Sequence, residues 1–208
     1  MTSLRVGLLV ISMFALSSRA ASAEPHAYTV DPARSRIVVH VGKAGVFGFA
    51  GHEHEVLAPV NRGAVALDPA HVEASSVDVH VDARSLRVTG RGEPPNDVAQ
   101  VQETMLGPAC LDAGRFPEIR FVSKAIGANR REGGRLEVTV RGTLTLHGVS
   151  REVTLPVHVD IEGDLLTAQG TLPLRQTDFG IKPISKAGVV KVEDELHLEL
   201  RLVARRAP

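Results

Sequence analysis

The sequence predicts an all-β fold in which one antiparallel sheet closes into a barrel that carries a short helical insertion. Three observations lead to this fold class. Apolar and polar side chains alternate in long segments, short polar turns rich in glycine separate these segments, and only one stretch has helical spacing.

Alternation is clearest in residues 136–147, where Leu and Val share one parity while Glu, Thr and Arg share the other. Residues 194–203 repeat it with four leucines. Because successive side chains of a strand point to opposite faces, each segment has one apolar and one polar face. Further strands are expected at residues 35–41, 46–49, 55–60, 63–68, 77–82, 119–125, 157–162 and 166–174.

Turn chemistry favours direct pairing between neighbouring strands. Residues 129–134 and 162–164 are polar and contain glycine, as hairpin connections do. Long regular strands would leave exposed edges in an open sheet, and closure into a barrel removes those edges. We therefore expect a barrel rather than a sandwich.

One segment departs from the period of two. Asn96 is a candidate N-cap, and Val98, Val101 and Met105 follow at helical spacing. Pro108 disfavours further helix. The sequence therefore predicts one short helix between two strands.

Residues 1–23 have the order of a secretory signal. A charged start is followed by an apolar run at residues 6–16 and by the small residues Ala21-Ser22-Ala23, and the run is too short to span a bilayer. We predict that export removes residues 1–23 and delivers one domain, residues 24–208, to the periplasm or the exterior. N-terminal sequencing of the mature protein should begin at Glu24. A full-length product held in the membrane would contradict this prediction.

Composition excludes several partners. The chain has 24 Lys and Arg and 24 Asp and Glu, and loss of Arg5 and Arg19 with the signal would leave a net charge of −2. Such a charge does not attract nucleic acid, and a chain with no Trp and one Tyr has few platforms for base stacking. No integral membrane segment is expected after the signal. Cys110 is the only cysteine and is expected to be a small buried apolar residue.

The sequence carries no Gly-x-Ser-x-Gly elbow and no Walker-type loop, so we expect no catalytic residues. His52 and His54 would share a face of a strand. They are open to three interpretations: structural histidines at the barrel rim, contacts to a ligand head group, or the start of a metal site. The third metal ligand would then be sought among His40, His80, His147 and His158.

Several segments together resemble the YceI-like family of periplasmic, polyisoprenoid-binding proteins. The resemblance covers nearly all of residues 28–204. Its most specific part is Gly142-Thr143-Leu144-Thr145-Leu146-His147-Gly148-Val149. The other matching segments are residues 28–35, 82–86, Phe116-Pro117-Glu118-Ile119-Arg120-Phe121 and Thr177-Asp178-Phe179-Gly180-Ile181.

The resemblance implies an extended, lipocalin-like antiparallel barrel of about eight strands with a tunnel for an isoprenoid chain, such as a quinone tail or a polyprenyl phosphate. No other cofactor and no metal are expected. The residues expected to line the tunnel are Phe47, Phe49, Met105, Leu106, Phe121, Leu144, Leu146, Phe179 and Ile181, and those expected at its rim or at a head group are His52, His54 and His147.

Two other functions stay open at this point. One is a metal- or redox-linked envelope protein that uses His52 and His54. The other is a structural barrel with no ligand, because small eight-stranded barrels can be filled by their own side chains.

Overall fold

The computed structural model of the chain describes residues 25–44, 54–132, 135–186 and 190–208. This part of the chain forms twelve strands, one α-helix and three short 3-10 helices. The strands are β1 (His26–Val30), β2 (Arg36–Ala44), β3 (His54–Ala58), β4 (Val60–Leu67), β5 (Ser76–Asp82), β6 (Arg87–Val88), β7 (Glu118–Glu132), β8 (Arg135–Leu146), β9 (Val149–Glu162), β10 (Leu165–Arg175), β11 (Ser185–Lys186) and β12 (Val190–Arg206). The helices are α1 (Val98–Leu106), η2 (Val72–Ala74), η3 (Ala83–Ser85) and η4 (Gln176–Phe179).

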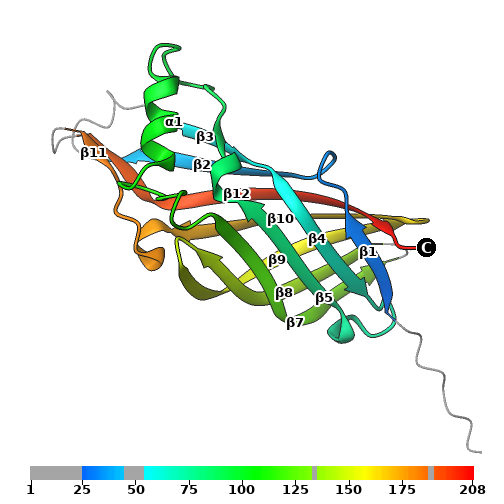
Figure 1. Cartoon of the computed structure of the whole chain (residues 1–208). Coiled ribbons are helices and arrows are strands. Elements are labelled where there is room, and N and C mark those ends of the chain that lie inside the picture. The colour runs from blue at the N-terminus through cyan, green and yellow to red at the C-terminus, as the bar shows by residue number, and fades with distance from the viewer. Residues whose placement is uncertain (1–24, 45–53, 133–134, 187–189) are drawn as a thin grey trace, which may run out of the picture.

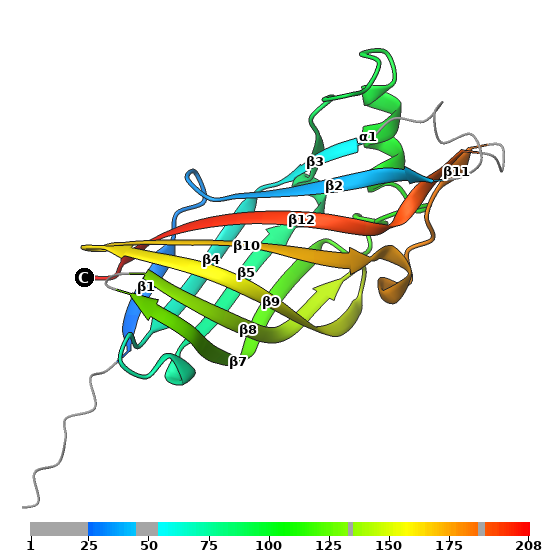
Figure 2. The same cartoon turned by 180° about the vertical axis from the view of Figure 1, so that it is seen from behind.

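Eight of the strands form a closed antiparallel ring. Their order around it is β1, β4, β5, β7, β8, β9, β10 and β12, and β12 pairs with β1 through Val30 and Ala204. The ring is elongated, with α1 near one end and the C-terminus at the other (Figures 1 and 2). The predicted eight-stranded barrel is therefore confirmed.

Near α1 the wall is continued by β2, β3 and β6. The long strand β12 pairs with β2 over its first part and with β1 at its end. The predicted strands 55–60 and 63–68 correspond to β3 and β4, but the break between them falls at Pro59 rather than after residue 60. Proline has no N–H to donate to the ladder, which explains the position of the break. The predicted strand 46–49 lies outside the described residues.

Helix α1 confirms the predicted helical insertion, but it starts differently. Asp97, not Asn96, precedes its first residue, and the Asp97 side chain makes no capping hydrogen bond. A backbone turn, in which the Asp97 N–H donates to the Pro94 carbonyl, leads directly into the helix. Among the described residues, no helix is long and apolar enough to cross a membrane.

The Gln102 side chain fastens α1 to the barrel wall. Its Nε2 donates to the Leu86 carbonyl at 2.9 Å, and its Oε1 accepts from the Val88 backbone N–H at 2.8 Å. Both backbone groups lie at β6, so one side chain replaces a missing strand neighbour there. This contact holds the helix beside the end of the barrel.

Strand β8 shows how the sequence pattern becomes the two faces of the wall. Leu136, Leu144 and Leu146 are buried toward the interior, whereas Glu137 and Arg141 are exposed. A slip of one residue would reverse every side chain, so the apolar parity determines the register. The predicted inward orientation of Leu144 and Leu146 is confirmed.

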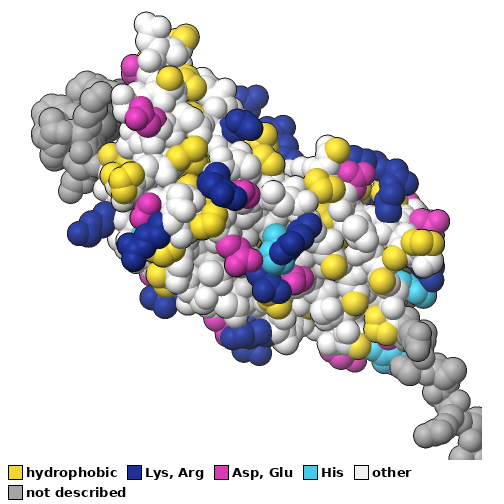
Figure 3. Space-filling view, viewed as in Figure 1, with side chains coloured by type: hydrophobic (Ala, Val, Ile, Leu, Met, Phe, Trp, Pro, Cys, Tyr) yellow, Lys and Arg dark blue, Asp and Glu magenta, His cyan; other side chains and the backbone are white. Residues whose placement is uncertain are grey.

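The side of the molecule seen in Figure 3 carries interspersed charges of both signs. One network lies over β5 and β7. There Arg120 Nη2 donates to Asp78 Oδ2 at 2.7 Å, and His80 lies between Asp78 at 3.1 Å and Glu118 at 3.3 Å. The hydrogen bond from Arg120 lowers the pKa of the Asp78 carboxyl. These groups are partly exposed, so we ascribe little stability to them.

Candidate functional site

The interior of the barrel contains a cavity of about 710 Å³. This volume lies within the range of small-molecule pockets, roughly 300–1,000 Å³. Aliphatic side chains from seven strands of the ring, all except β1, line most of it together with side chains from β2, β3 and β6. The polar side chains among the described lining residues are His54, Ser75, Glu93, Asp97, Gln100, Thr104 and Gln176.

The interior is an open lumen and not a filled core. Leu196, Leu198 and Leu200 point inward and line the cavity, yet each is only half-buried. Phe121 also lines the cavity and is only half-buried. An inward side chain keeps accessible area only when there is space in front of it. The alternative of a barrel filled by its own side chains is therefore wrong.

The structure places the expected tunnel residues in three groups. Met105, Phe121, Leu144, Leu146 and Ile181 line the cavity. Leu106 and Phe179 are not among the described lining residues, and Phe47 and Phe49 lie outside the described part of the chain. A ligand-binding role for any of them stays a prediction.

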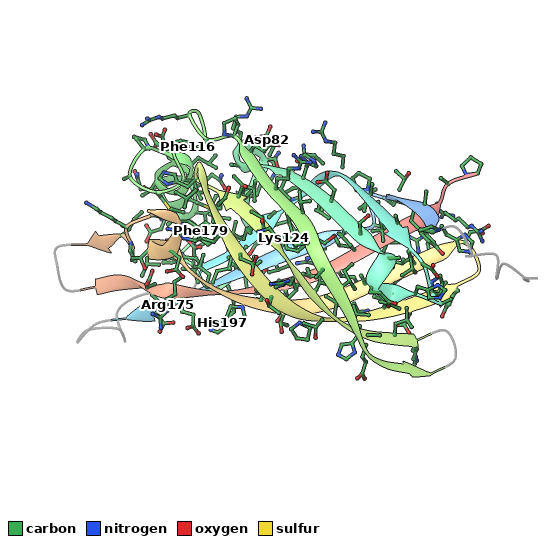
Figure 4. The ribbon with its side chains drawn as sticks, turned by 90° about the horizontal axis from the view of Figure 1, so that it is seen from below. Asp82, Phe116, Lys124, Arg175, Phe179 and His197 are labelled. Atoms are coloured by element: carbon green, nitrogen blue, oxygen red, sulfur yellow. The ribbon has the colours of Figure 1, made fainter. Side chains whose placement is uncertain are left out.

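Phe179 lies in the packed core instead. Its residue is 1% exposed, and it ends η4, which folds over the end of the barrel against β9, β10 and β12. Gly180 follows with φ of 73°, a conformation that glycine adopts without strain. Figure 4 shows Phe116 and Phe179 at the same end of the barrel.

His147 fastens these segments together. It forms a two-residue hairpin turn with Gly148, both at positive φ, between β8 and β9. Its Nδ1 donates to the Phe179 carbonyl at 3.2 Å, and its ring meets the Phe116 ring edge-on at 4.6 Å between centroids. His147 thus lies in a turn at the end of the barrel and is not among the described residues that line the cavity, so its expected rim or head-group role stays a prediction.

His54 does line the cavity, and its closest ionisable neighbour is Glu93. Nδ1 of His54 lies 3.0 Å from Oε1 of Glu93, whose side chain is only 1% exposed. The angles of this approach do not meet those of a hydrogen bond, so within the described residues both Glu93 oxygens lack a hydrogen-bond partner. His52 lies outside the described residues.

Glu55, the neighbour of His54 on β3, positions Glu93. Its carboxylate faces away from the cavity and accepts from Thr89 Oγ1 at 3.1 Å and from Arg91 Nη1 at 3.2 Å. The Thr89 backbone N–H also donates to the Glu55 carbonyl. The turn that begins at Gly90 then brings the Glu93 N–H to the Gly90 carbonyl. These contacts fold the Glu93 carboxylate back over His54.

One face of α1 completes the polar end of the cavity. Asp97, Gln100 and Thr104 line it together with Val101 and Met105, at the spacing of one helical stripe. Asp97 and Gln100 are exposed, so the cavity reaches the surface beside α1. Sequence reasoning used only the apolar members of this stripe, although its period also predicted the positions of the polar ones.

The candidate third metal ligands lie apart from His54. His40 faces Glu199 at 3.6 Å, His158 faces Glu137 at 3.9 Å, and His80 lies in the network on β5 and β7. In the part of the chain that the structure describes, no three His, Cys, Asp or Glu side chains gather in a group that could hold a metal ion. The described residues therefore give the metal interpretation no support.

Cys110 also lines the cavity and is half-buried. Burial raises the pKa of its thiol, because the charged thiolate is less well solvated there. The thiol is therefore neutral near pH 7. This agrees with the expectation of an apolar residue rather than a reactive one.

Comparison with known proteins agrees with this architecture. Residues 28–204 match the YceI-like domain. A UPF0312 protein of Pseudomonas syringae pv. syringae is 30% identical over 126 residues, a match that covers 58% of this chain and 59% of that protein. A UPF0312 protein of Vibrio cholerae is 29% identical over 147 residues, covering 66% and 68%. The chain thus spans less than two thirds of the length of the Pseudomonas relative.

Two solved structures share the barrel. BcnA of Burkholderia cenocepacia has a TM-score of 0.65 at 24% identity, over 84% of this chain and 98% of that one. A polyisoprenoid binding domain from Saccharophagus degradans, implicated in plant cell wall breakdown, has a TM-score of 0.61 at 14% identity, over 88% and 99%. The family match spans most of the sequence and nearly the whole barrel, and so this chain belongs to the YceI-like family.

Proposed function

We propose that this protein binds or carries a polyisoprenoid or similar long apolar lipid in its barrel, and that it does so in the periplasm. The observation that carries the proposal is the cavity of about 710 Å³ with its aliphatic lining. The Saccharophagus degradans domain, described as polyisoprenoid binding, has the same barrel, which supports this ligand class. The secretory signal expected at residues 1–23 supports the location.

The energetics favour a chain-like ligand. Burial of one methylene contributes roughly 0.8 kcal/mol, so three isoprene units would contribute more than about 10 kcal/mol before the entropy cost of association is subtracted. An aliphatic wall provides this favourable free energy of burial without specific polar contacts. Binding is then a matter of chain length and of a few polar contacts at one end.

The arrangement favours binding over catalysis. The cavity wall offers hydrophobic surface along its length, and three of its polar residues, Asp97, Gln100 and Thr104, lie on or next to α1. No nucleophile paired with a base is seen among the described lining residues. A bound isoprenoid lipid or quinone would be cargo in this proposal, and the protein would need no other cofactor.

We predict that protein purified from its own envelope contains about one apolar chain per barrel. Organic extraction followed by mass spectrometry measures the bound lipid, and titration of stripped protein with isoprenoid alcohols of increasing length measures the affinity. Affinity should rise with chain length until the cavity is filled, because buried apolar area is the main favourable term. An empty extract together with affinity independent of length would refute the proposed function.

A further inference from the structure

The polar end of the cavity carries an unsatisfied buried carboxylate. Glu93 has a side chain that is 1% exposed, and its Oε1 is 3.0 Å from His54 Nδ1. Within the described residues neither of its oxygens accepts a hydrogen bond, and both residues line the cavity. Buried carboxylates are normally hydrogen-bonded, because loss of water is costly for a charged group. A donor from water or from a molecule in the cavity would complete the hydrogen bonding of this carboxylate.

The charges at this end restrict the chemistry of that molecule. Glu93 and Asp97 are acidic, and His54 is the one basic side chain among the described residues that line the cavity. A phosphate head group would face two carboxylates, and like charges brought together in a partly buried site repel each other. A hydroxyl group instead carries no charge and supplies the missing donor.

We propose that the His54–Glu93 pair is a head-group subsite that selects isoprenoids ending in a hydroxyl group over those ending in a phosphate. The inference rests on the proposed function, since it names the head of the chain that the barrel would hold. The Glu93 carboxylate accepts the hydrogen bond of the ligand hydroxyl. His54 orients the carboxylate, and Gln100 and Thr104 on α1 supply further polar contacts at the mouth. The chain then lies along the aliphatic wall.

The test compares three ligands with one C20 isoprenoid chain: geranylgeraniol, its methyl ether and its monophosphate. The wild-type protein should bind the alcohol about 10-fold or more tightly than the ether or the phosphate, as one hydrogen bond to a charged group implies. In Glu93→Leu, which removes both acceptor oxygens at similar size, this preference should fall to within about 2-fold, with affinity for the ether retained. Affinity for the ether also shows that the variant is folded.

Asp68→Asn is the matched control. Asp68 is a buried carboxylate near the other end of the barrel that accepts backbone hydrogen bonds from Ala70 and His71 and is not among the described lining residues. This variant should keep the wild-type preference. A hydroquinone and its quinone with the same chain show whether the favoured hydroxyl is phenolic or aliphatic.

Two results would overturn the inference while leaving the lipid-binding function intact: tighter binding of the phosphate than of the alcohol, or an alcohol preference that persists in Glu93→Leu. If none of the three ligands binds, the proposed function itself has failed. Failure of the head-group proposal can therefore be distinguished from failure of the lipid-binding proposal.

Discussion

Replacing Phe179 with Ala should lower the free energy of unfolding by about 3–5 kcal/mol. Phe179 is 1% exposed and lies where η4 closes over β9, β10 and β12. The backbone around it is held by His147 at the Phe179 carbonyl and by Asp194, which accepts from the Thr177 N–H at 2.9 Å. Because these contacts limit collapse of the surroundings, truncation should leave a cavity in place of the ring.

The matched comparison is Leu146→Ala. Leu146 is also buried, at 9% exposure, but it lines the existing cavity. Its truncation enlarges a space that is already there, so the loss should be about 2–2.5 kcal/mol, which is the transfer term alone for three methylene equivalents. Urea unfolding of ligand-free protein followed by circular dichroism measures both values. Equal losses would mean that Phe179 is not part of a packed core distinct from the lumen.

Replacing Ala168 with Trp should reduce affinity for long isoprenoids by roughly 100-fold while short ones bind as before. Ala168 lines the cavity from β10, where it pairs with Leu202 of β12. Leu196, near the polar end beside His54, lies six residues back along β12, which is about 20 Å at the rise of a strand. An indole at this level blocks the lumen beyond that point. Each excluded methylene costs roughly 0.8 kcal/mol.

Gln169→Trp is the control, because Gln169 is the next residue of β10 and is exposed on the outer face. It adds the same side chain without entering the lumen and should leave the length dependence unchanged. Ala168→Phe should give a smaller effect in the same direction. Titration with isoprenoid alcohols of increasing length measures the series. If Ala168→Trp binds the longest chain as tightly as wild type does, the ligand does not extend along the barrel.

The alternation in β8 and β12 was sufficient to predict strands, their inward faces and a barrel. Val138 and Glu137 differ in polarity at adjacent positions, and only one register puts the first inside and the second outside. The helix was also predicted, from the spacing of Val98, Val101 and Met105. Its first residue was not predicted correctly, because the chain enters the helix one residue later, through a turn from Pro94 to Asp97.

The sequence predicted only some of the residues that line the cavity. Leu144 and Leu146 were expected along the tunnel from parity together with the family resemblance, and they line the cavity. Phe179 was placed with them because it is large and apolar, but size and polarity do not distinguish a packed core from the wall of a lumen. That distinction depends on whether another element fills the space in front of the side chain, as η4 and the turn at His147 do here.

The sequence by itself determined the fold class, the inward parity of the strands, the helical insertion and the family, because each rests on a local period or a contiguous motif. Only the tertiary structure decided that the interior is hollow and that Glu93 meets His54 at one end of it. Glu93 belongs to a polar turn far along the chain from β3, and the interactions of Glu55 with Thr89 and Arg91 fold that turn back. The periodicity of a single segment cannot predict such a contact, because the contact depends on how the loops pack against the closed sheet.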